Sequence, residues 1–177
     1  MTFAIMCEHI MSSPKLFRRM ENVFIIVEGL TDVRYLSQLL GSYLGASYKV
    51  LFYKTDGYSS MLTSIRPIID QVPLGSKVVF VFDADTRNQE KAEERLDFFK
   101  EQIGNIRKTC KASAFYFMPE IEDFIMGDDE SYMGRKKVNQ DEMIAYIESH
   151  RDELLKKSPV KDIIAFVEGK DQKQNPG

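Results

Sequence analysis

The chain has 177 residues, 44% hydrophobic and 29% charged, a composition that suits one globular domain. Its 24 Lys and Arg residues against 27 Asp and Glu residues give a net charge of −3, which excludes the overall basic field of many non-specific nucleic-acid binders. Cys7, Cys110, His9 and His150 are too few and too scattered for a disulfide framework or a zinc site. We therefore expect free thiols in a reducing compartment.

No targeting or membrane segment is predicted. Residues 1–20 lack the basic start and long apolar run of a secretory signal, and no apolar stretch approaches the roughly 18 residues of a membrane span. We expect a soluble, cytoplasmic protein without a membrane partner. The GxxxxGK[ST] phosphate loop is also absent from the sequence, so any associated ATP hydrolysis would need another chain.

Strands and helices alternate along the first two thirds of the chain. Residues 23–27 (VFIIV) and 77–82 (KVVFVF) are apolar runs typical of buried parallel strands, and residues 48–53 (YKVLFY) and 112–118 are further strand candidates. Three segments with apolar residues at helical spacing lie between them: residues 31–45, residues 61–69 around Pro67, and residues 89–103. This order predicts an α/β domain with a mainly parallel, four-stranded sheet flanked by helices.

Two more helices are predicted near the C-terminus. Asn139, with Glu142, resembles a capping box ahead of an apolar series, and Ser158-Pro159 opens a short helix that ends at Gly169. The expected organisation is an α/β domain at 1–126 with a motif-bearing core at 23–118. An extension at 127–169 packs on this core and a disordered tail occupies 170–177. The apolar faces of the two helices could also serve a homodimer.

Three carboxylates follow the two most apolar strands. Glu28 comes directly after the strand at 23–27, and Asp83 and Asp85 come after the strand at 77–82. Ligands of parallel α/β sheets bind at the carboxyl ends of the strands, and residues two apart in an extended segment point to the same side. Adjacent carboxylates would repel one another unless a cation lay between them. Oxygen-only ligands favour Mg²⁺ or Mn²⁺, which suits phosphoryl transfer. A plain loop or helix cap is the alternative for the Asp-x-Asp pair.

The segments FIIVEGLTDVRYLSQLL and VFVFDADT resemble the Toprim domain of topoisomerases, bacterial primases, recombination-mediator proteins and nucleases of the overcoming-lysogenization-defect (OLD) type. The resemblance covers residues 23–118 and implies a compact Rossmann-like fold. It implies that Glu28 acts as general acid or base or shares in metal binding, and that Asp83 and Asp85 bind Mg²⁺. Gly29 would let the backbone turn tightly beside the site. The chain reads DADTRNQE where many Toprim domains have a nearby glycine, which favours divergent small Toprim and OLD-type nucleases as guides.

Other residues are candidates for supporting roles. Glu122, in MPEIEDFI after the fourth strand, could bind a second metal ion, although early acidic residues also suit the positive end of a helix. Lys54 and Arg87 each follow a strand and could bind a substrate phosphate, or be plain surface residues. Residues 135–137 (RKK) are the best local basic patch for a nucleic-acid backbone, with an ordinary exposed loop as the alternative.

Three functions are compatible with these motifs. The first is a Toprim-like, Mg²⁺-dependent nuclease that hydrolyses DNA or RNA, with water as nucleophile. The second is a non-catalytic Toprim subunit that works beside a separately encoded ATPase or in a nucleic-acid-processing complex. The third is a phosphatase of the haloacid-dehalogenase type, because FDADT resembles the start of its motif with Asp83 as nucleophile and IMGDDE as an acidic partner.

Overall fold

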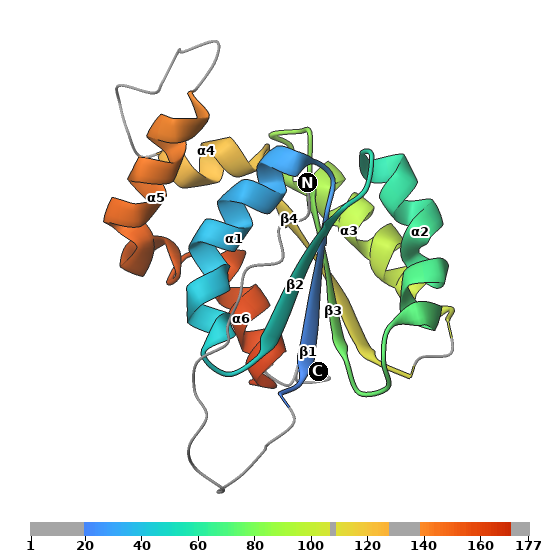
Figure 1. Cartoon of the computed structure of the whole chain (residues 1–177). Helices are drawn as coiled ribbons and strands as arrows, with labels where there is room; N and C mark the ends of the chain where they lie inside the picture. Colours follow the sequence, from blue (N-terminus) through green and yellow to red (C-terminus); the bar gives the residue numbers. More distant parts are fainter. Residues whose placement is uncertain (1–19, 107–108, 128–138, 171–177) are drawn as a thin grey trace, which may run out of the picture.

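The computed structural model describes residues 20–106, 109–127 and 139–170, and its centre is a four-stranded sheet (Figure 1). The strands are β1 (Asn22–Val27), β2 (Lys49–Lys54), β3 (Lys77–Asp83) and β4 (Lys111–Phe117), in the order β2-β1-β3-β4. Every neighbouring pair is parallel. The expected α/β, Rossmann-like fold is therefore confirmed, and the sheet is wholly rather than mainly parallel.

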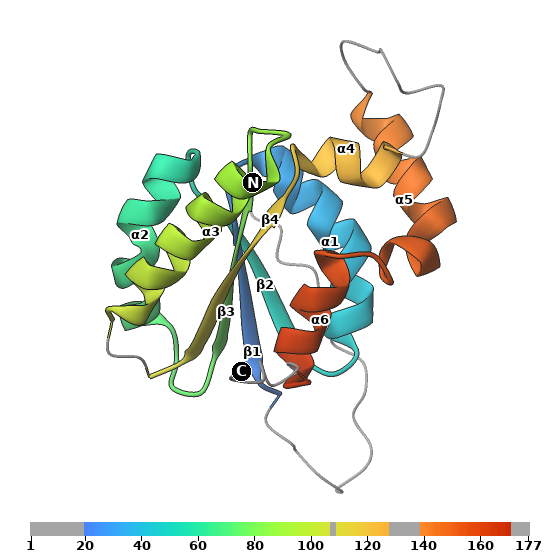
Figure 2. The same ribbon diagram turned by 180° about the vertical axis from the view of Figure 1, so that it is seen from behind.

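Helices cover both faces of the sheet, which gives three layers (Figure 1, Figure 2). One face carries α2 and α3, and the opposite face carries α1 and α6, with α5 packed against α1. The helices are α1 (Leu30–Gly45), α2 (Tyr58–Gln71), α3 (Gln89–Gly104), α4 (Ile121–Met126), α5 (Gln140–Leu154) and α6 (Val160–Glu168). The predicted alternation of strands and helices is confirmed by this order.

Burial on both faces explains why β1 and β3 are almost continuously apolar. Residues 77–82 of β3 are all buried, and β1 contributes Val23 and Ile25 to one core and Ile26 to the other. Full burial of each such aliphatic side chain stabilises the fold by about 1.5–3 kcal/mol. Ile25 of β1 pairs with Val79 of β3, so these strands are direct neighbours and their carboxyl ends meet at one edge.

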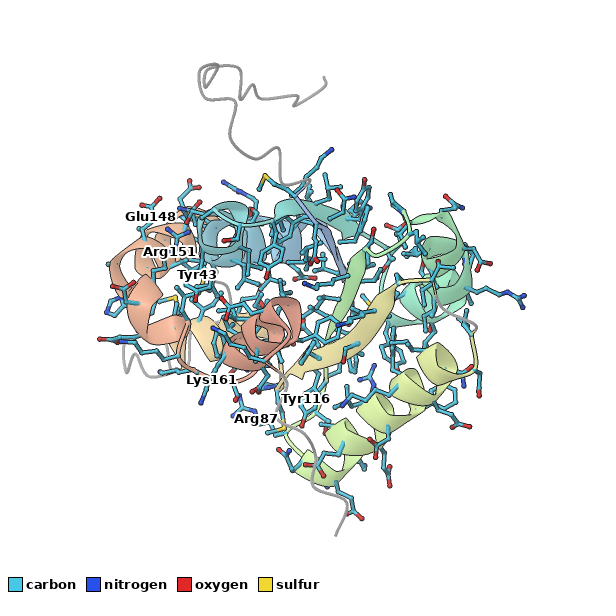
Figure 3. All side chains as sticks on the ribbon, turned by 90° about the horizontal axis from the view of Figure 1, so that it is seen from below. Tyr43, Arg87, Tyr116, Glu148, Arg151 and Lys161 are labelled. Carbon is cyan, nitrogen blue, oxygen red and sulfur yellow. The ribbon has the colours of Figure 1, made fainter. Side chains whose placement is uncertain are left out.

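The C-terminal helices complete the core on the α1 side of the sheet. The Asn139 side chain accepts a hydrogen bond from the Asp141 N–H at 2.9 Å and so caps α5 as expected. Arg151 of α5, labelled in Figure 3, donates to the Gln38 carbonyl of α1 at 2.6 Å. The apolar residues of α5 and α6 are buried against α1 and the sheet: Met143, Ile147, Leu154, Val160, Ile163 and Val167.

This packing decides between two expectations for α5 and α6. Their apolar faces pack back on the chain's own core and are buried there, and a homodimer stays a prediction that these faces do not support. No helix in the described part of the chain is both long and apolar enough to cross a membrane. The basic run at 135–137 and the tail at 171–177 lie outside the described residues.

Candidate functional site

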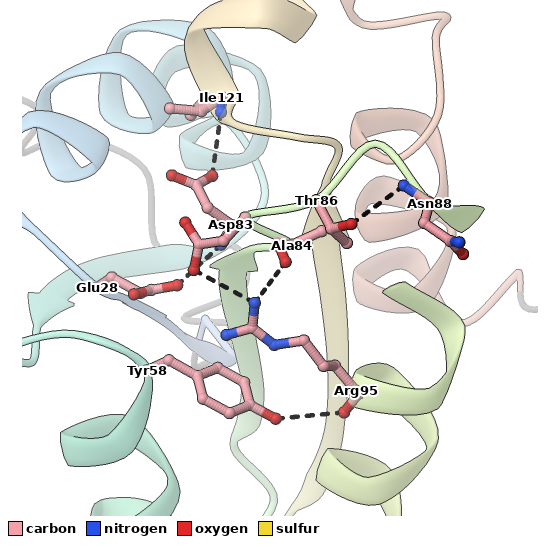
Figure 4. A network of polar contacts seen from close by, with 9 residues as sticks. Glu28, Tyr58, Asp83, Ala84, Thr86, Asn88, Arg95 and Ile121 are labelled. Carbon is pink, nitrogen blue, oxygen red and sulfur yellow. Dashed lines mark hydrogen bonds and ion pairs between the residues drawn. The ribbon is translucent and has the colours of Figure 1, made fainter. Parts of the chain in front are cut away.

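Glu28 and Asp83 meet at the carboxyl edge of the sheet (Figure 4). Glu28 follows β1 directly and Asp83 is the last residue of β3. The Asp83 backbone N–H donates to Glu28 Oε1 at 2.9 Å, which fixes the glutamate across the two neighbouring strands. Burial raises the pKa of the Glu28 carboxyl, and the nearby carboxylates of Asp85 and Asp32 raise it further against the lowering effect of the Asp83 N–H.

Asp83 is the most perturbed carboxyl group of this edge. Its Oδ1 accepts a hydrogen bond from the Ile121 N–H, at the start of α4, at 3.0 Å. Burial, and then repulsion from Asp32, Glu122 and Glu28, raises the pKa of Asp83 to about 8. Without a cation, this carboxyl group is therefore mostly protonated at neutral pH.

Asp32 is a member of the cluster that the sequence analysis did not assign. It lies in the first turn of α1, where its Oδ2 accepts the Gly29 N–H at 2.8 Å, and burial raises its pKa. Its charge also acts on Glu28, Asp83 and Glu122. A signal was present in VEGLTD, because a helix that begins straight after a strand places its first turn at the same edge of the sheet.

Glu122 approaches the cluster from the β4 side. It lies in the first turn of α4, where acidic residues suit the helix dipole. Burial raises its pKa first, and Asp32, Glu120 and Asp123 raise it further. Glu122 also contributes to the raised pKa of Asp83. Its place at a helix start is as expected, and its expected role as a ligand of a second metal ion stays a prediction.

Asp85 lies beyond the end of the strand that carries Asp83. The strand ends at Asp83, and Asp85 has a left-handed backbone with φ of 53°, so the alternation of an extended strand does not reach it. Its Oδ2 lies 3.2 Å from Nη1 of Arg95, its side chain is 59% exposed, and its charge raises the pKa of Glu28. Asp85 therefore belongs to the same edge of the sheet, but strand alternation is not what brings it there, and its role as a metal ligand stays a prediction.

Three residues were predicted to bind substrate: two are exposed and paired with aspartates, and the third is the N-cap of α1. Lys54 ends β2 and forms an exposed ion pair with Asp56 at 2.7 Å. Arg87 is 81% exposed and lies 3.2 Å from Asp123. Gly29 caps α1 with φ of −132°, a backbone that any residue can adopt, and an added Cβ would meet only Asp32 Oδ2 at 3.5 Å. The backbone geometry therefore does not itself require glycine at this position.

Arg95 of α3 and Tyr58 of α2 are further polar residues at this edge that the sequence analysis did not single out. The Arg95 guanidinium donates to the Ala84 carbonyl and lies over the Tyr58 ring, 4.2 Å from its centroid. The Tyr58 hydroxyl in turn donates to the Arg95 carbonyl at 3.3 Å (Figure 4). These contacts depend on how two helices dock on the sheet, which no local sequence pattern encodes.

The donor set suits a hard divalent cation bound mainly through water. Within residues 20–106, 109–127 and 139–170, no three His, Cys, Asp or Glu side chains converge closely enough to hold a metal by themselves. Mg²⁺ commonly uses only one or two carboxylates and keeps several waters. The raised pKa of Asp83 reflects burial first and then the negative charge of its neighbours, and a cation would relieve the second of these. Asp83 and Glu28 therefore fit an aquated Mg²⁺ or Mn²⁺ ion better than a cage of three or four carboxylates.

Comparison with protein-family models, with curated proteins and with solved structures gave no match to this chain.

Proposed function

We propose that this protein is a divergent Toprim-like phosphodiesterase that uses Mg²⁺ or Mn²⁺ to hydrolyse DNA or RNA. The observation that carries the proposal is the position of Asp83. It lies at the carboxyl edge of a parallel sheet, hydrogen-bonded through its N–H to Glu28 and crowded by Asp32 and Glu122. Crowded carboxylates do not stabilise a folded protein by themselves, but they favour binding of a cation, and a bound cation can in turn bind a phosphoester.

Each acidic residue has a specific role in this proposal. Asp83 and Glu28 would hold the metal ion, and Glu122 and Asp85 would bind its water ligands. When bound, the ion would neutralise charge that develops on the phosphate and would lower the pKa of a bound water. The raised pKa of Glu28 brings this carboxyl group closer to the working range of a general base or acid. Its Oε1 is fixed by the Asp83 N–H, which leaves Oε2 to exchange a proton with the attacking water.

The alternative functions receive less support. A phosphatase of the haloacid-dehalogenase type would use Asp83 as its nucleophile, but Asp83 Oδ1 already accepts a hydrogen bond from the Ile121 N–H. That reading also gives no role to Glu28, and IMGDDE lies partly outside the described residues. A non-catalytic subunit working with an ATPase would keep the same fold, so cleavage by the isolated chain separates it from the proposed nuclease.

Metal-dependent cleavage is the first test. The purified chain should cleave single-stranded DNA or RNA with Mg²⁺ or Mn²⁺ and not with EDTA. Glu28→Gln should lower the rate at least about 100-fold, the usual contribution of general acid-base catalysis. Asp83→Asn should abolish cleavage, and Asp97→Asn, an exposed control on α3, should not change it. Cleavage that survives Asp83→Asn would refute the site, and a phosphoaspartate trapped on Asp83 would support the phosphatase.

A further inference from the structure

Arg95 is a fixed cation beside the acidic cluster. Its side chain is 29% exposed, and its guanidinium lies over the Tyr58 ring, close to Glu28 and Ala84 (Figure 4). Tyr58 packs in turn against Phe82 and Phe99, with ring centroids 5.1 Å and 6.0 Å apart. Stacking on the partly buried Tyr58 ring and the hydrogen bond to Ala84 leave the guanidinium little rotational freedom, so Arg95 is oriented before any ligand binds.

Only part of the guanidinium is used within the protein. Nη1 donates to the Ala84 carbonyl and to Asp85 Oδ2. No described residue accepts a hydrogen bond of good geometry from Nη2 or Nε, and their neighbour within the protein is the Tyr58 side chain. A guanidinium carries donors in a planar fork that matches the oxygens of a phosphate. The free side of Arg95 is therefore suited to an anion at the carboxyl edge of the sheet.

The acidic cluster makes the choice of anion specific. A free anion would be repelled by Glu28 and Asp83 unless their charge were neutralised. A phosphoester that shares a divalent ion with these carboxylates avoids this repulsion, because the metal and the arginine would each contact it from one side. The carboxylates would therefore bind the cation, and Arg95 would bind the phosphate next to it.

We infer that Arg95 is the phosphate ligand of this site and binds a non-bridging oxygen of the phosphoester through Nη2 and Nε. This inference rests on the proposed function and deepens it. The residues predicted from sequence for this task are placed less well, because Lys54 and Arg87 are held in exposed ion pairs with Asp56 and Asp123. Arg95 is the least exposed of the three cations, and its charge acts on Glu28 (Figure 4).

Two matched substitutions test the inference, Arg95→Lys and Arg87→Lys. The affinity of inorganic phosphate for the full chain is measured by calorimetry in the presence of Mg²⁺. Loss of the fork geometry in Arg95→Lys should weaken phosphate binding about 10- to 100-fold, as expected when a charge-assisted hydrogen bond is lost. Arg87→Lys should change it by no more than about twofold, because exposed ion pairs contribute little.

Direct observation of the wild-type arginine keeps the test independent of how the variants fold. The Nε–H resonance of Arg95 in ¹⁵N-labelled protein should shift when phosphate is added with Mg²⁺. An unshifted resonance, or phosphate affinity equal to wild type in folded Arg95→Lys, would overturn the inference. If one of these two results is found but Mg²⁺ still binds and its binding depends on Asp83, only the proposed role of Arg95 is refuted. If the wild-type chain does not bind Mg²⁺, the proposed function fails as well.

Discussion

Burial of a single carboxyl group, that of Asp83, lowers the stability of the fold when the group is ionised. Its carboxyl group is buried beside Asp32, Glu122 and Glu28, and its pKa is about 8 in place of the ordinary 3.8. Each unit of such a difference corresponds to about 1.4 kcal/mol between the two protonation states. The bound proton and the hydrogen bond that Oδ1 accepts from the Ile121 N–H offset part of this cost.

The pH dependence of stability should reveal this cost. The folded pKa of Asp83 lies above its unfolded value, so the folded state holds the proton more tightly. Stability of the metal-free protein is therefore lost as pH rises from about 4 to about 8 and levels off above that range. Asp83→Asn should remove the loss, so the variant should exceed wild type by about 1–3 kcal/mol at pH 7 in urea unfolding.

Exposed carboxylates provide the control for this measurement. Asp97→Asn on α3 should leave the free energy of unfolding within about 0.5 kcal/mol of wild type at every pH. A difference between Asp83→Asn and wild type that did not grow from pH 4 to pH 8 would show that Asp83 is an ordinary surface carboxylate.

At the scale of elements, the sequence correctly predicted the strands and helices, because these depend on the local periodicity of apolar residues. The apolar run at 77–82 became β3 (Lys77–Asp83), and α2 (Tyr58–Gln71) continues past Pro67, which lies on its exposed side. Glu28 and Asp83 were predicted together because parallel strands end at one edge. Asp32 was missed although its place in the first turn after β1 is readable from VEGLTD, whereas the contacts of Arg95 follow from helix docking, which no local pattern encodes.

The two C-terminal helices provide a test at this scale. Ile147 of α5 is fully buried against the α1 side of the core. Ile147→Ala should therefore lower the free energy of unfolding by about 2–5 kcal/mol, as expected for a large-to-small change in a core. Leu74→Ala, at a position 84% exposed, should change it by less than about 0.5 kcal/mol. Both are measured by urea unfolding.

Sedimentation of the same two variants distinguishes a core from an interface. If Ile147→Ala altered the oligomeric state and left the unfolding free energy unchanged, the apolar face of α5 would be a dimer surface and the packing described here would be refuted.

At the scale of the whole molecule, the sheet order brings distant segments to one edge. β1 and β3 carry Glu28 and Asp83, α1 and α4 add Asp32 and Glu122, and α3 adds Arg95. The acidic residues come from segments nearly 100 positions apart, yet their carboxylates affect one another's pKa. This convergence on the ligand-binding edge of a parallel sheet is the basis for assigning phosphoryl-transfer chemistry to the molecule.

Crystals soaked in Mn²⁺ give the most direct test of the metal site. Anomalous scattering should show a Mn²⁺ ion beside Asp83 and Glu28 at the carboxyl edge of the sheet, with water completing its coordination. The same soak of Asp83→Asn crystals should lose this peak. The account would be contradicted if wild-type crystals bound Mn²⁺ only elsewhere, or if the peak beside Glu28 remained after Asp83→Asn.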